Sequence, residues 1–494
     1  MLPWVLGVVA VVYRLSFPRA IGEADESFLL CAAARMLRGE VIYRDVFEFV
    51  APLGYYFYAA VFGLGGVTLL AARVATASVE AVGIGLMFSL ARRVADPFAA
   101  LVAALVVPIV CIPAWPYASP HWLSTTLHLG VAAVVLSERG HASERLRPAL
   151  AGLLAGAAVC VQQSRGLFIV VWAILATLVL AFDAPPAGRW RRVWLELWWL
   201  GAGGIGVTAL VMGYAVWAAS PRLVYAGVVE YVFGGYARAI KPVAWASMGD
   251  LAPSWMPSVW RPALRWGPAA TMLFEAIALL WASRGGSGRG ERVRLCLLLL
   301  AACAALSIWY FPDYVHVAFV LPFFLILGAH LLHVMGSVRW EMTVALSIGI
   351  LAALMGEAGG NLMRAWRDAP RTFVTAFGTL QGSERVEQVA TAVQRAVERD
   401  PADHRWLYVY PADAWLYLTT GARNPTRFSL LLPGLNSPAQ VDEVLSDLRG
   451  RRPGTVVVNL SLAPATDVLR AAVEADYLMV EEVAQIRIYR LRAD

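Results

Sequence analysis

Charge is scarce in this sequence, and lysine is nearly absent. Charged residues make up 15% of the 494 residues, and Lys241 is the only lysine. Soluble globular domains carry about 25% charged residues, so the composition excludes an ordinary soluble globule. The net charge of +6 comes from arginines in a strongly apolar chain, and we expect no nucleic-acid partner.

Cysteine is scarce as well. The five cysteines lack the C-x-x-C spacing typical of metal sites and mostly lie in apolar segments. They indicate neither a disulfide framework nor a structural metal. We expect no cofactor, although the carboxylates of Asp25 and Glu26, together with Asp45 or Asp313, could supply the oxygen ligands of a divalent cation.

Long apolar segments make up most of the sequence. Hydrophobic residues make up 59% of the chain, and its mean hydropathy is +0.61. These segments predict a mainly α-helical, polytopic transmembrane bundle with eleven spans within residues 1–359. The predicted spans cover residues 2–17, 67–91, 97–113, 119–136, 148–161, 166–182, 193–219, 267–283, 293–310, 314–333 and 341–358.

Arginines occupy alternate connections between these spans, and the intervening short turns contain only Arg165. Short cytoplasmic loops are enriched in arginine and lysine, so we expect the arginine-rich connections in the cytoplasm. The first loop (19–58), the long loop (220–265) and everything after residue 359 are then expected at the outer face of a bacterial cytoplasmic membrane.

After residue 359 the composition becomes that of a soluble domain. Helical patterns near 384–399 and 438–449 alternate with strand-like segments at 406–410, 455–460 and 486–491. This alternation predicts an extracytoplasmic α/β domain over residues 360–494. The domain contains no catalytic motif, and its expected role is to recognise an acceptor or to brace the outer loops.

The first outer loop contains a short amphipathic helix with an acidic start. Its apolar residues recur at helical spacing from Leu30 to Leu37, and Arg35 and Arg38 fall outside this stripe, which predicts a helix lying on the membrane surface. Asp25 and Glu26 at its start have a structural interpretation, as a cap and as a partner of the helix dipole. They also have a catalytic one, because a carboxylate beside a membrane cleft could accept the proton of an attacking hydroxyl.

The order of motifs in the first 95 residues resembles the GT-C superfamily. These motifs are the acidic pair at a helix start, an Arg-Gly at its end, Tyr-Arg-Asp at 43–45, an acidic residue before Pro-Leu-Gly-Tyr-Tyr at 52–56, and a span. GT-C proteins are polytopic glycosyltransferases that use polyprenyl-phosphate-linked sugars. The nearest branch looks like the protein-mannosyltransferase and lipid A aminoarabinose-transferase group. The resemblance implies that Asp25 is the catalytic aspartate of the first outer loop and Glu26 its acidic neighbour.

One departure from the family pattern concerns the donor phosphate. Many relatives place a lysine just before the proline, whereas Glu48 to Ala51 precede Pro52 here. A departing phosphate gains negative charge and needs a cation. Arg165 is the first candidate, with an arginine that reaches the lipid headgroups as the alternative. Arg238 and Lys241 in the long loop come second, with solvated charges as the alternative.

Further polar residues complete the candidate site at the outer face. Asp313 and His316 precede a late span, and the resemblance implies that His316 binds the donor phosphate or sugar and Asp313 a sugar hydroxyl. An Asx-type turn with an interfacial histidine is the alternative. Glu48 is also assigned to the donor side. Secondary candidates are Arg44, Asp45, Tyr55 and His121.

Two carboxylates, Glu80 and Glu275, fall inside predicted spans, where ionisable residues are costly unless paired. Arg73 lies two turns before Glu80 on the same predicted helix, and we expect these two residues to pair.

The sequence therefore predicts an inverting hexosyl- or pentosyltransferase. It would move a sugar from a polyprenyl-phosphate donor to a hydroxyl on a lipid, glycan or protein, with Asp25 as general base. The alternatives are a flippase or other transporter of lipid-linked sugars and a non-catalytic membrane assembly factor. Polar clusters at the outer rim and the lack of internal repeats favour the enzyme over a transporter. The missing lysine leaves the assembly factor open.

Overall fold

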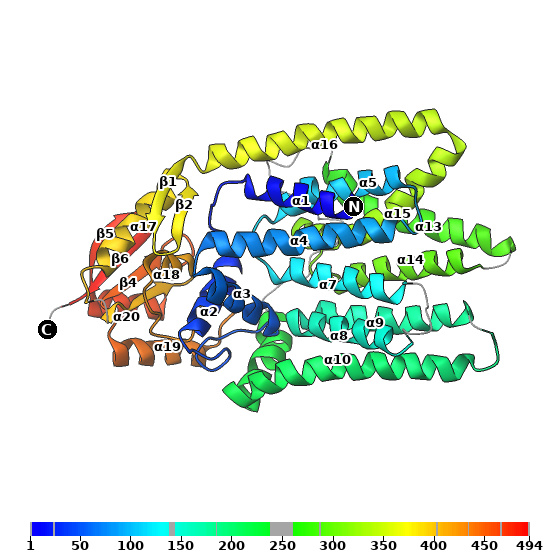
Figure 1. The fold of residues 1–494 in the computed structure, drawn as a ribbon. Coiled ribbons are helices and arrows are strands. Elements are labelled where there is room, and N and C mark those ends of the chain that lie inside the picture. Colours follow the sequence, from blue (N-terminus) through cyan, green and yellow to red (C-terminus); the bar gives the residue numbers. More distant parts are fainter. Residues whose placement is uncertain are drawn as a thin grey trace.

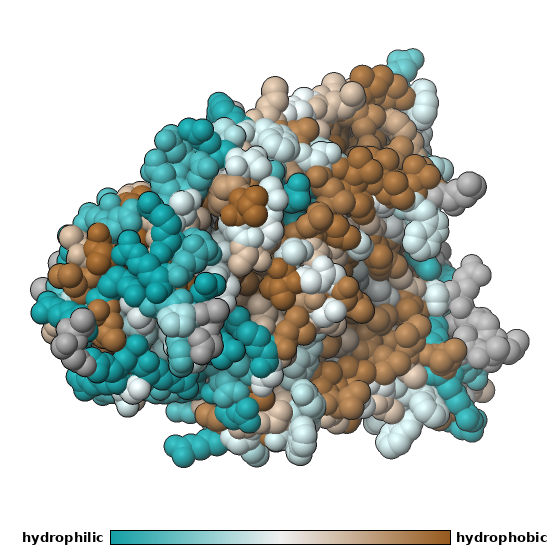
Figure 2. Space-filling model, turned by 60° about the vertical axis from the view of Figure 1, so that its left-hand side comes forward, coloured by the Kyte–Doolittle hydropathy of each residue, from teal (hydrophilic) through white to brown (hydrophobic). Residues whose placement is uncertain are grey.

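The computed structural model describes residues 2–22, 25–137, 144–183, 185–237, 260–285, 288–401, 404–432, 434–464 and 467–492. A bundle of long helices lies on one side, and a smaller unit of strands and short helices covers one end of it (Figure 1). Hydrophobic residues cover much of the bundle surface, whereas hydrophilic residues dominate the smaller unit (Figure 2).

Each predicted span corresponds to a helix. The helices are α1 (Leu2–Leu15), α4 (Leu69–Ala91), α5 (Pro97–Val106) continued by η1 (Val107–Cys111) and α6 (Ile112–Ala114), α7 (Pro120–Val135), α8 (Leu146–Val161), α9 (Gln163–Leu180), α10 (Arg189–Ala219), α13 (Trp260–Ala282), α14 (Arg289–Ser307), α15 (Tyr314–Val338) and α16 (Trp340–Asp368). Six of them, counted among the described residues, are long and apolar enough to cross a membrane: α4, α5–α6, α9 with its terminal turn, α10, α15 and α16. The protein is thus a membrane protein, and the count of eleven crossings stays a prediction.

Small residues set the distance between α8 and α10. A Cβ atom added at Gly152 would overlap with the backbone carbonyl of Leu200, and one added at Gly203 would overlap with that of Ala149. Glycine at these positions lets the two backbones approach closely, which is a common device for packing membrane helices. By contrast, a Cβ at Gly201 or Gly206 would meet no atom within 4 Å.

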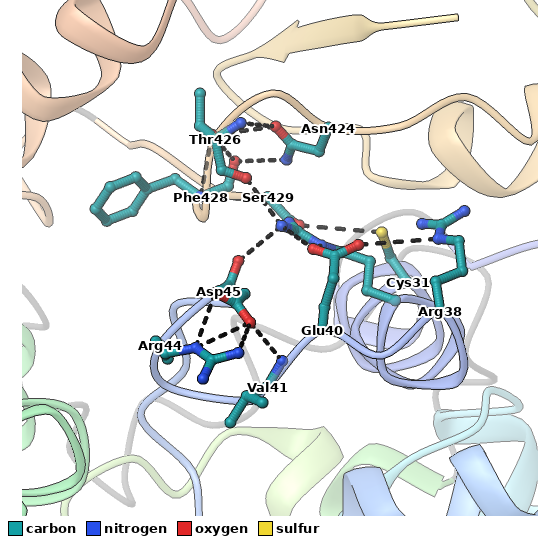
Figure 3. Close-up of polar contacts among 11 residues, drawn as sticks. Cys31, Arg38, Glu40, Val41, Arg44, Asp45, Asn424, Thr426, Phe428 and Ser429 are labelled. Atoms are coloured by element: carbon teal, nitrogen blue, oxygen red, sulfur yellow. Dashed lines mark hydrogen bonds and ion pairs between the residues drawn. The ribbon is translucent and has the colours of Figure 1, made fainter. Parts of the chain in front are cut away.

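Between the bundle and the smaller unit lie α2 (Asp25–Leu37) and α3 (Leu53–Gly65). Arg35 falls outside the apolar stripe of α2, as the sequence pattern indicates, and yet it is buried, with only 2% of its surface exposed. Its guanidinium donates to the backbone oxygens of Asp45, at 2.7 Å, and of Thr426, at 3.0 Å. The segment at 424–429 covers this side of the helix (Figure 3), and the position of α2 at the membrane surface stays a prediction.

Downstream of α10, the long loop begins with α11 (Pro221–Tyr225) and the π-helical η4 (Ala226–Tyr236). This pair of short helices follows the end of α10 that is nearest to α2 and α3 (Figure 1).

The smaller unit begins where α16 ends at Asp368, beyond the composition change at residue 359. A hairpin of β1 (Arg371–Thr375) and β2 (Gly378–Gly382) precedes a four-stranded sheet of order β3-β4-β6-β5. Its strands are β3 (Leu407–Tyr410), β4 (Thr455–Asn459), β5 (Tyr477–Val483) and β6 (Ile486–Leu491). β3 and β4 are parallel, whereas the β4–β6 and β5–β6 pairs are antiparallel. The helices are α17 (Glu384–Val397), α18 (Trp415–Thr420), α19 (Pro438–Arg451) and α20 (Val468–Asp476).

Candidate active site

Asp25 opens α2 and keeps access to solvent. Protein atoms nevertheless surround its carboxyl closely enough to desolvate the charged form, and this raises the pKa of Asp25. The charge of His316 lowers this pKa and the charge of Asp313 raises it, which places both groups within electrostatic reach. The start of the first-loop helix therefore faces the start of α15, although almost 290 residues separate them in sequence.

Asp313 and His316 form a local pair at the start of α15. The Asp313 carboxylate accepts hydrogen bonds from the backbone N–H of His316 at 2.8 Å and lies 2.6 Å from its Nδ1. Asp313 is thus the N-cap of the helix, as the Asx-type interpretation predicts. The cap also holds the imidazole in one orientation, and Nε2 of His316 makes no hydrogen bond with any described residue.

His121 on α7 links His316 to Arg165 on α9. Its ring lies edge-on to His316, with centroids 5.1 Å apart, and stacks on Phe319 at 4.5 Å. The Arg165 guanidinium donates to the backbone oxygen of His121 at 3.1 Å and to Oγ1 of Thr125 at 2.9 Å. The structure thus brings His316, His121 and Arg165 into one cluster of contacts, and Asp25 lies within electrostatic reach of its His316 end.

Arg165 is deeply buried, at 2% exposure, and its described partners are neutral. No carboxylate within the described ranges forms an ion pair with it, and its Nε makes no hydrogen bond there. Isolated charges are expensive to bury, and buried charges are normally paired. The cluster therefore presents an uncompensated positive charge that suits an anion.

Glu26 has a different environment from Asp25. It is fully buried, and its carboxylate pairs with Arg73 at 2.7 Å. It also accepts the backbone N–H groups of Gly22, at 2.6 Å, and Ala118, at 2.7 Å. Both carboxylate oxygens of Glu26 thus take part in hydrogen bonds that connect the start of the first loop to the turn before α7.

The predicted pair of Arg73 with Glu80 is wrong, because the ion pair of Arg73 goes to Glu26. Arg14 of α1 approaches Glu80 instead, at 3.6 Å. The second intramembrane carboxylate, Glu275, lies 2.6 Å from Nε of Arg294 and 2.7 Å from Nδ1 of His330. Both intramembrane acids thus have basic neighbours on other helices.

Glu48 lies beside this cluster. Its residue is 8% exposed, and its Oε2 accepts a hydrogen bond from the Tyr55 hydroxyl at 2.6 Å. Burial raises the pKa of Glu48 to about 8, and the Asp25 charge adds to this shift. Arg44 and Asp45 are instead paired with each other, at 2.8 Å, on the exposed part of the loop, and Asp45 also accepts the backbone N–H of Val41 (Figure 3).

Two tyrosines of the cluster escaped the sequence prediction. Tyr236 of η4 interacts electrostatically with Tyr310 and Asp25, and burial raises its pKa to about 12. The hydroxyl of Tyr310 bonds the side chain of Ser164 and feels the charge of Arg165. Tyrosines are common at membrane interfaces, so composition offered no signal to single these two out.

The remaining predicted residues, Arg238 and Lys241, lie outside the described residues. Within the described part of the chain, no group of three or more His, Cys, Asp or Glu side chains is placed to hold a metal ion.

The fold described above, a polytopic helical bundle with an α/β unit at one end, is shared with solved structures over nearly the whole chain. The chain is similar to the crystal structure of ArnT from Cupriavidus metallidurans bound to undecaprenyl phosphate, with a TM-score of 0.62 and 15% identity over 98% of this chain and 97% of that chain. It is similar to the apo state of the same protein, with a TM-score of 0.59 and 15% identity over 98% and 96%. The archaeal oligosaccharyltransferase AglB from Archaeoglobus fulgidus, in complex with an inhibitory peptide and a dolichol-phosphate, matches with a TM-score of 0.56 and 13% identity over 97% and 72%.

No family model matches the chain, and no curated protein matches it. At such low sequence identities, the similarity to solved structures establishes the fold alone. The chain has the fold of GT-C glycosyltransferases over nearly its whole length, as its first 95 residues predict.

Proposed function

We propose that the protein is an inverting glycosyltransferase. It moves a sugar from a polyprenyl phosphate to an acceptor hydroxyl at the outer face of a bacterial cytoplasmic membrane. The observation that carries this proposal is the buried, carboxylate-free guanidinium of Arg165 in one cluster with Asp25 and His316. Two solved structures with the same fold are complexes with undecaprenyl phosphate and dolichol-phosphate, which supports a lipid-linked donor.

The proposed reaction is a single displacement. The acceptor oxygen forms a bond to the anomeric carbon, its proton passes to the Asp25 carboxylate, and the bond from that carbon to the phosphate oxygen breaks. The electron pair leaves with the polyprenyl phosphate, whose charge Arg165 and His316 stabilise. The raised pKa of Asp25 makes it a stronger base than an ordinary aspartate. Glu26 positions the loop through Arg73, and Glu48 binds a sugar hydroxyl beside Asp25.

The proposed orientation places the smaller unit outside the cell. The helix ends that carry the arginine-rich connections gather at the end of the bundle opposite to this unit (Figure 1). That distribution supports cytoplasmic arginines and an outer α/β domain.

Sugar transfer by the purified protein tests the proposal directly. A panel of polyprenyl-phosphate hexoses and pentoses is offered with a mixed set of hydroxyl acceptors, and product is measured by mass spectrometry. Asp25→Asn is expected to lower the rate by about 10²–10⁴-fold, the usual contribution of a general base. Asp45→Asn is the matched control, because it removes a carboxylate of the same loop outside the cluster.

Unchanged turnover in Asp25→Asn would remove Asp25 as the base. Absence of transfer from every donor would favour the lipid-sugar flippase or the assembly factor.

A further inference from the structure

A groove of about 520 Å³ opens beside the cluster, between the bundle side and the smaller unit. Small-molecule sites typically measure about 300–1,000 Å³, so the groove is large enough for a short chain of sugar residues. Its bundle side includes Tyr43, Phe47, Glu48 and Tyr231, and its other side includes Arg427 and Asn436.

Aromatic rings form one wall of the groove. Tyr231 packs on Phe47 and Phe49 with centroids 5.1 and 5.2 Å apart, and Phe49 continues to Tyr236 at 5.2 Å. These contacts hold the rings rigidly, and Tyr231 retains a partly exposed surface. Flat aromatic faces with a polar edge suit the C–H faces and hydroxyl groups of sugars.

The charges in the groove disfavour an anionic ligand. Glu230 contributes an exposed carboxylate, Glu48 adds no positive charge, and the one arginine among the described lining residues, Arg427, is held by both oxygens of Glu443 at 2.6 and 2.9 Å. The lining thus offers hydrogen-bond acceptors and a neutralised cation. This is the opposite of the Arg165 surroundings, which suit a phosphate.

Glu48 joins the groove to the catalytic cluster. It lines the groove, and the backbone oxygen of the next residue, Phe49, accepts a hydrogen bond at 2.9 Å from Nε2 of Gln163, two residues before Arg165. Besides burial, the charge of Asp25 also raises the pKa of Glu48. The backbone of η4 fixes this end, because a Cβ at Gly227 would lie 2.5 Å from the backbone oxygen of Glu48. A hydroxyl bound at the Glu48 end would therefore lie at the end of the groove that adjoins the Arg165 cluster and is within electrostatic reach of Asp25.

We propose that this groove binds a neutral glycan and presents one of its hydroxyls to Asp25 as the acceptor. The role as acceptor site rests on the proposed transferase function, whereas glycan binding itself does not. The aromatic wall would stack the sugar rings, and Glu48 and Glu230 would accept hydrogen bonds from their hydroxyls.

Binding without turnover tests the groove. The full-length protein in lipid nanodiscs is titrated with neutral hexasaccharides of glucose, mannose, galactose or arabinose, and saturation-transfer NMR reports binding. We expect at least one of them to bind, and Tyr231→Ala to weaken that binding at least tenfold. Tyr225→Ala is the matched control, because it removes an exposed tyrosine of α11 that does not line the groove. Glu230→Ala, at an exposed position, is expected to weaken binding severalfold without affecting folding.

Several outcomes would overturn the groove proposal. Binding that Tyr231→Ala and Glu230→Ala leave unchanged would do so, and so would binding of a trilysine peptide in place of every oligosaccharide. Transfer that proceeds only to lipid or peptide acceptors would reject the groove and leave the transferase standing. Oligosaccharide binding that depends on Tyr231, without transfer from any donor, would support the groove and reject the transferase.

Discussion

The two ends of the helical bundle differ in how their charged side chains are paired. At the arginine-rich end, acidic and basic side chains are matched: Asp183 with Arg292 at 2.5 Å, Arg147 with Glu196 at 3.1 Å, Asp96 with His333 at 3.0 Å, and Glu275 with Arg294 at 2.6 Å. At the end beneath the α/β unit, Asp25 and Arg165 make no ion pair with any described residue, and Glu48 is held by a tyrosine hydroxyl.

This difference supports the proposed ligand site at the end beneath the α/β unit. Matched charges stabilise a membrane fold, whereas unmatched buried charges reduce stability and persist where a ligand completes them. Other charged groups at this end are paired, among them Arg35 with Glu40 and Glu26 with Arg73, and the second pair anchors the start of the loop that carries Asp25.

Substituting Arg165 should separate function from stability most clearly. Arg165→Leu removes an uncompensated buried charge, so we expect at least a hundredfold loss of sugar transfer with no fall in Tm. Transfer is measured with the lipid-linked donor, and Tm by thermal unfolding in detergent. Arg165→Lys is the graded variant, since it keeps the charge and loses the planar donors. A large fall in Tm for Arg165→Leu would mean that the guanidinium is a structural element.

Arg294→Leu should give the reverse pattern at the other end. It leaves Glu275 buried beside His330 alone, and breaking a buried pair typically costs about 3–5 kcal/mol. We expect a lower Tm and near-normal transfer per folded molecule. The double variant Arg294→Leu with Glu275→Leu should recover much of the lost stability, because no charge is then left unpaired. Equal stability of the single variant and the unmodified protein would contradict this assignment.

The pH dependence of kcat/KM should report the environment of Asp25. The base must be deprotonated, so activity falls as the pH drops through its pKa, which lies above the ordinary aspartate value. His316→Gln removes a positive charge that lowers this pKa, and the acid limb should move to higher pH. Asp313→Asn removes a negative charge that raises it, and the limb should move to lower pH. Shifts in the same direction for both variants would argue against the assigned contacts.

Glu48→Gln should change the stability of the protein in a way that depends on pH. The folded state holds the Glu48 proton up to about pH 8, whereas an unfolded glutamate releases it near pH 4.3. The folded state therefore binds more protons in this window, and the Glu48 contribution to stability falls as pH rises through it. The Tm advantage of Glu48→Gln should be absent at pH 4 and grow up to about pH 8. Glu230→Gln, at an exposed carboxylate of the same groove, is the control.

Parts of the α/β unit were predictable and parts were not. The strongly amphipathic α17 and the apolar β3, β4 and β6 lie where the sequence pattern predicts them. The β1–β2 hairpin and β5 were missed. Their alternation is weak: β5 exposes most of its residues, and the hairpin mixes polar and apolar positions. The burial of these strands depends on what packs against them rather than on their own residues.

The sequence by itself determined the apolar helices, the segregation of arginines to one end of the bundle, and a first loop that opens with an acidic pair. Hydropathy and helix starts are local properties, so neighbouring residues suffice to predict them. Only the tertiary structure decided that Asp25 has no ion-pair partner among the described residues whereas Glu26 pairs with Arg73. It also decided that Arg35 is buried and donates to the backbone oxygen of Thr426. These outcomes depend on contacts between residues 47 to almost 400 positions apart, and no local pattern specifies which charged groups the folded chain brings together.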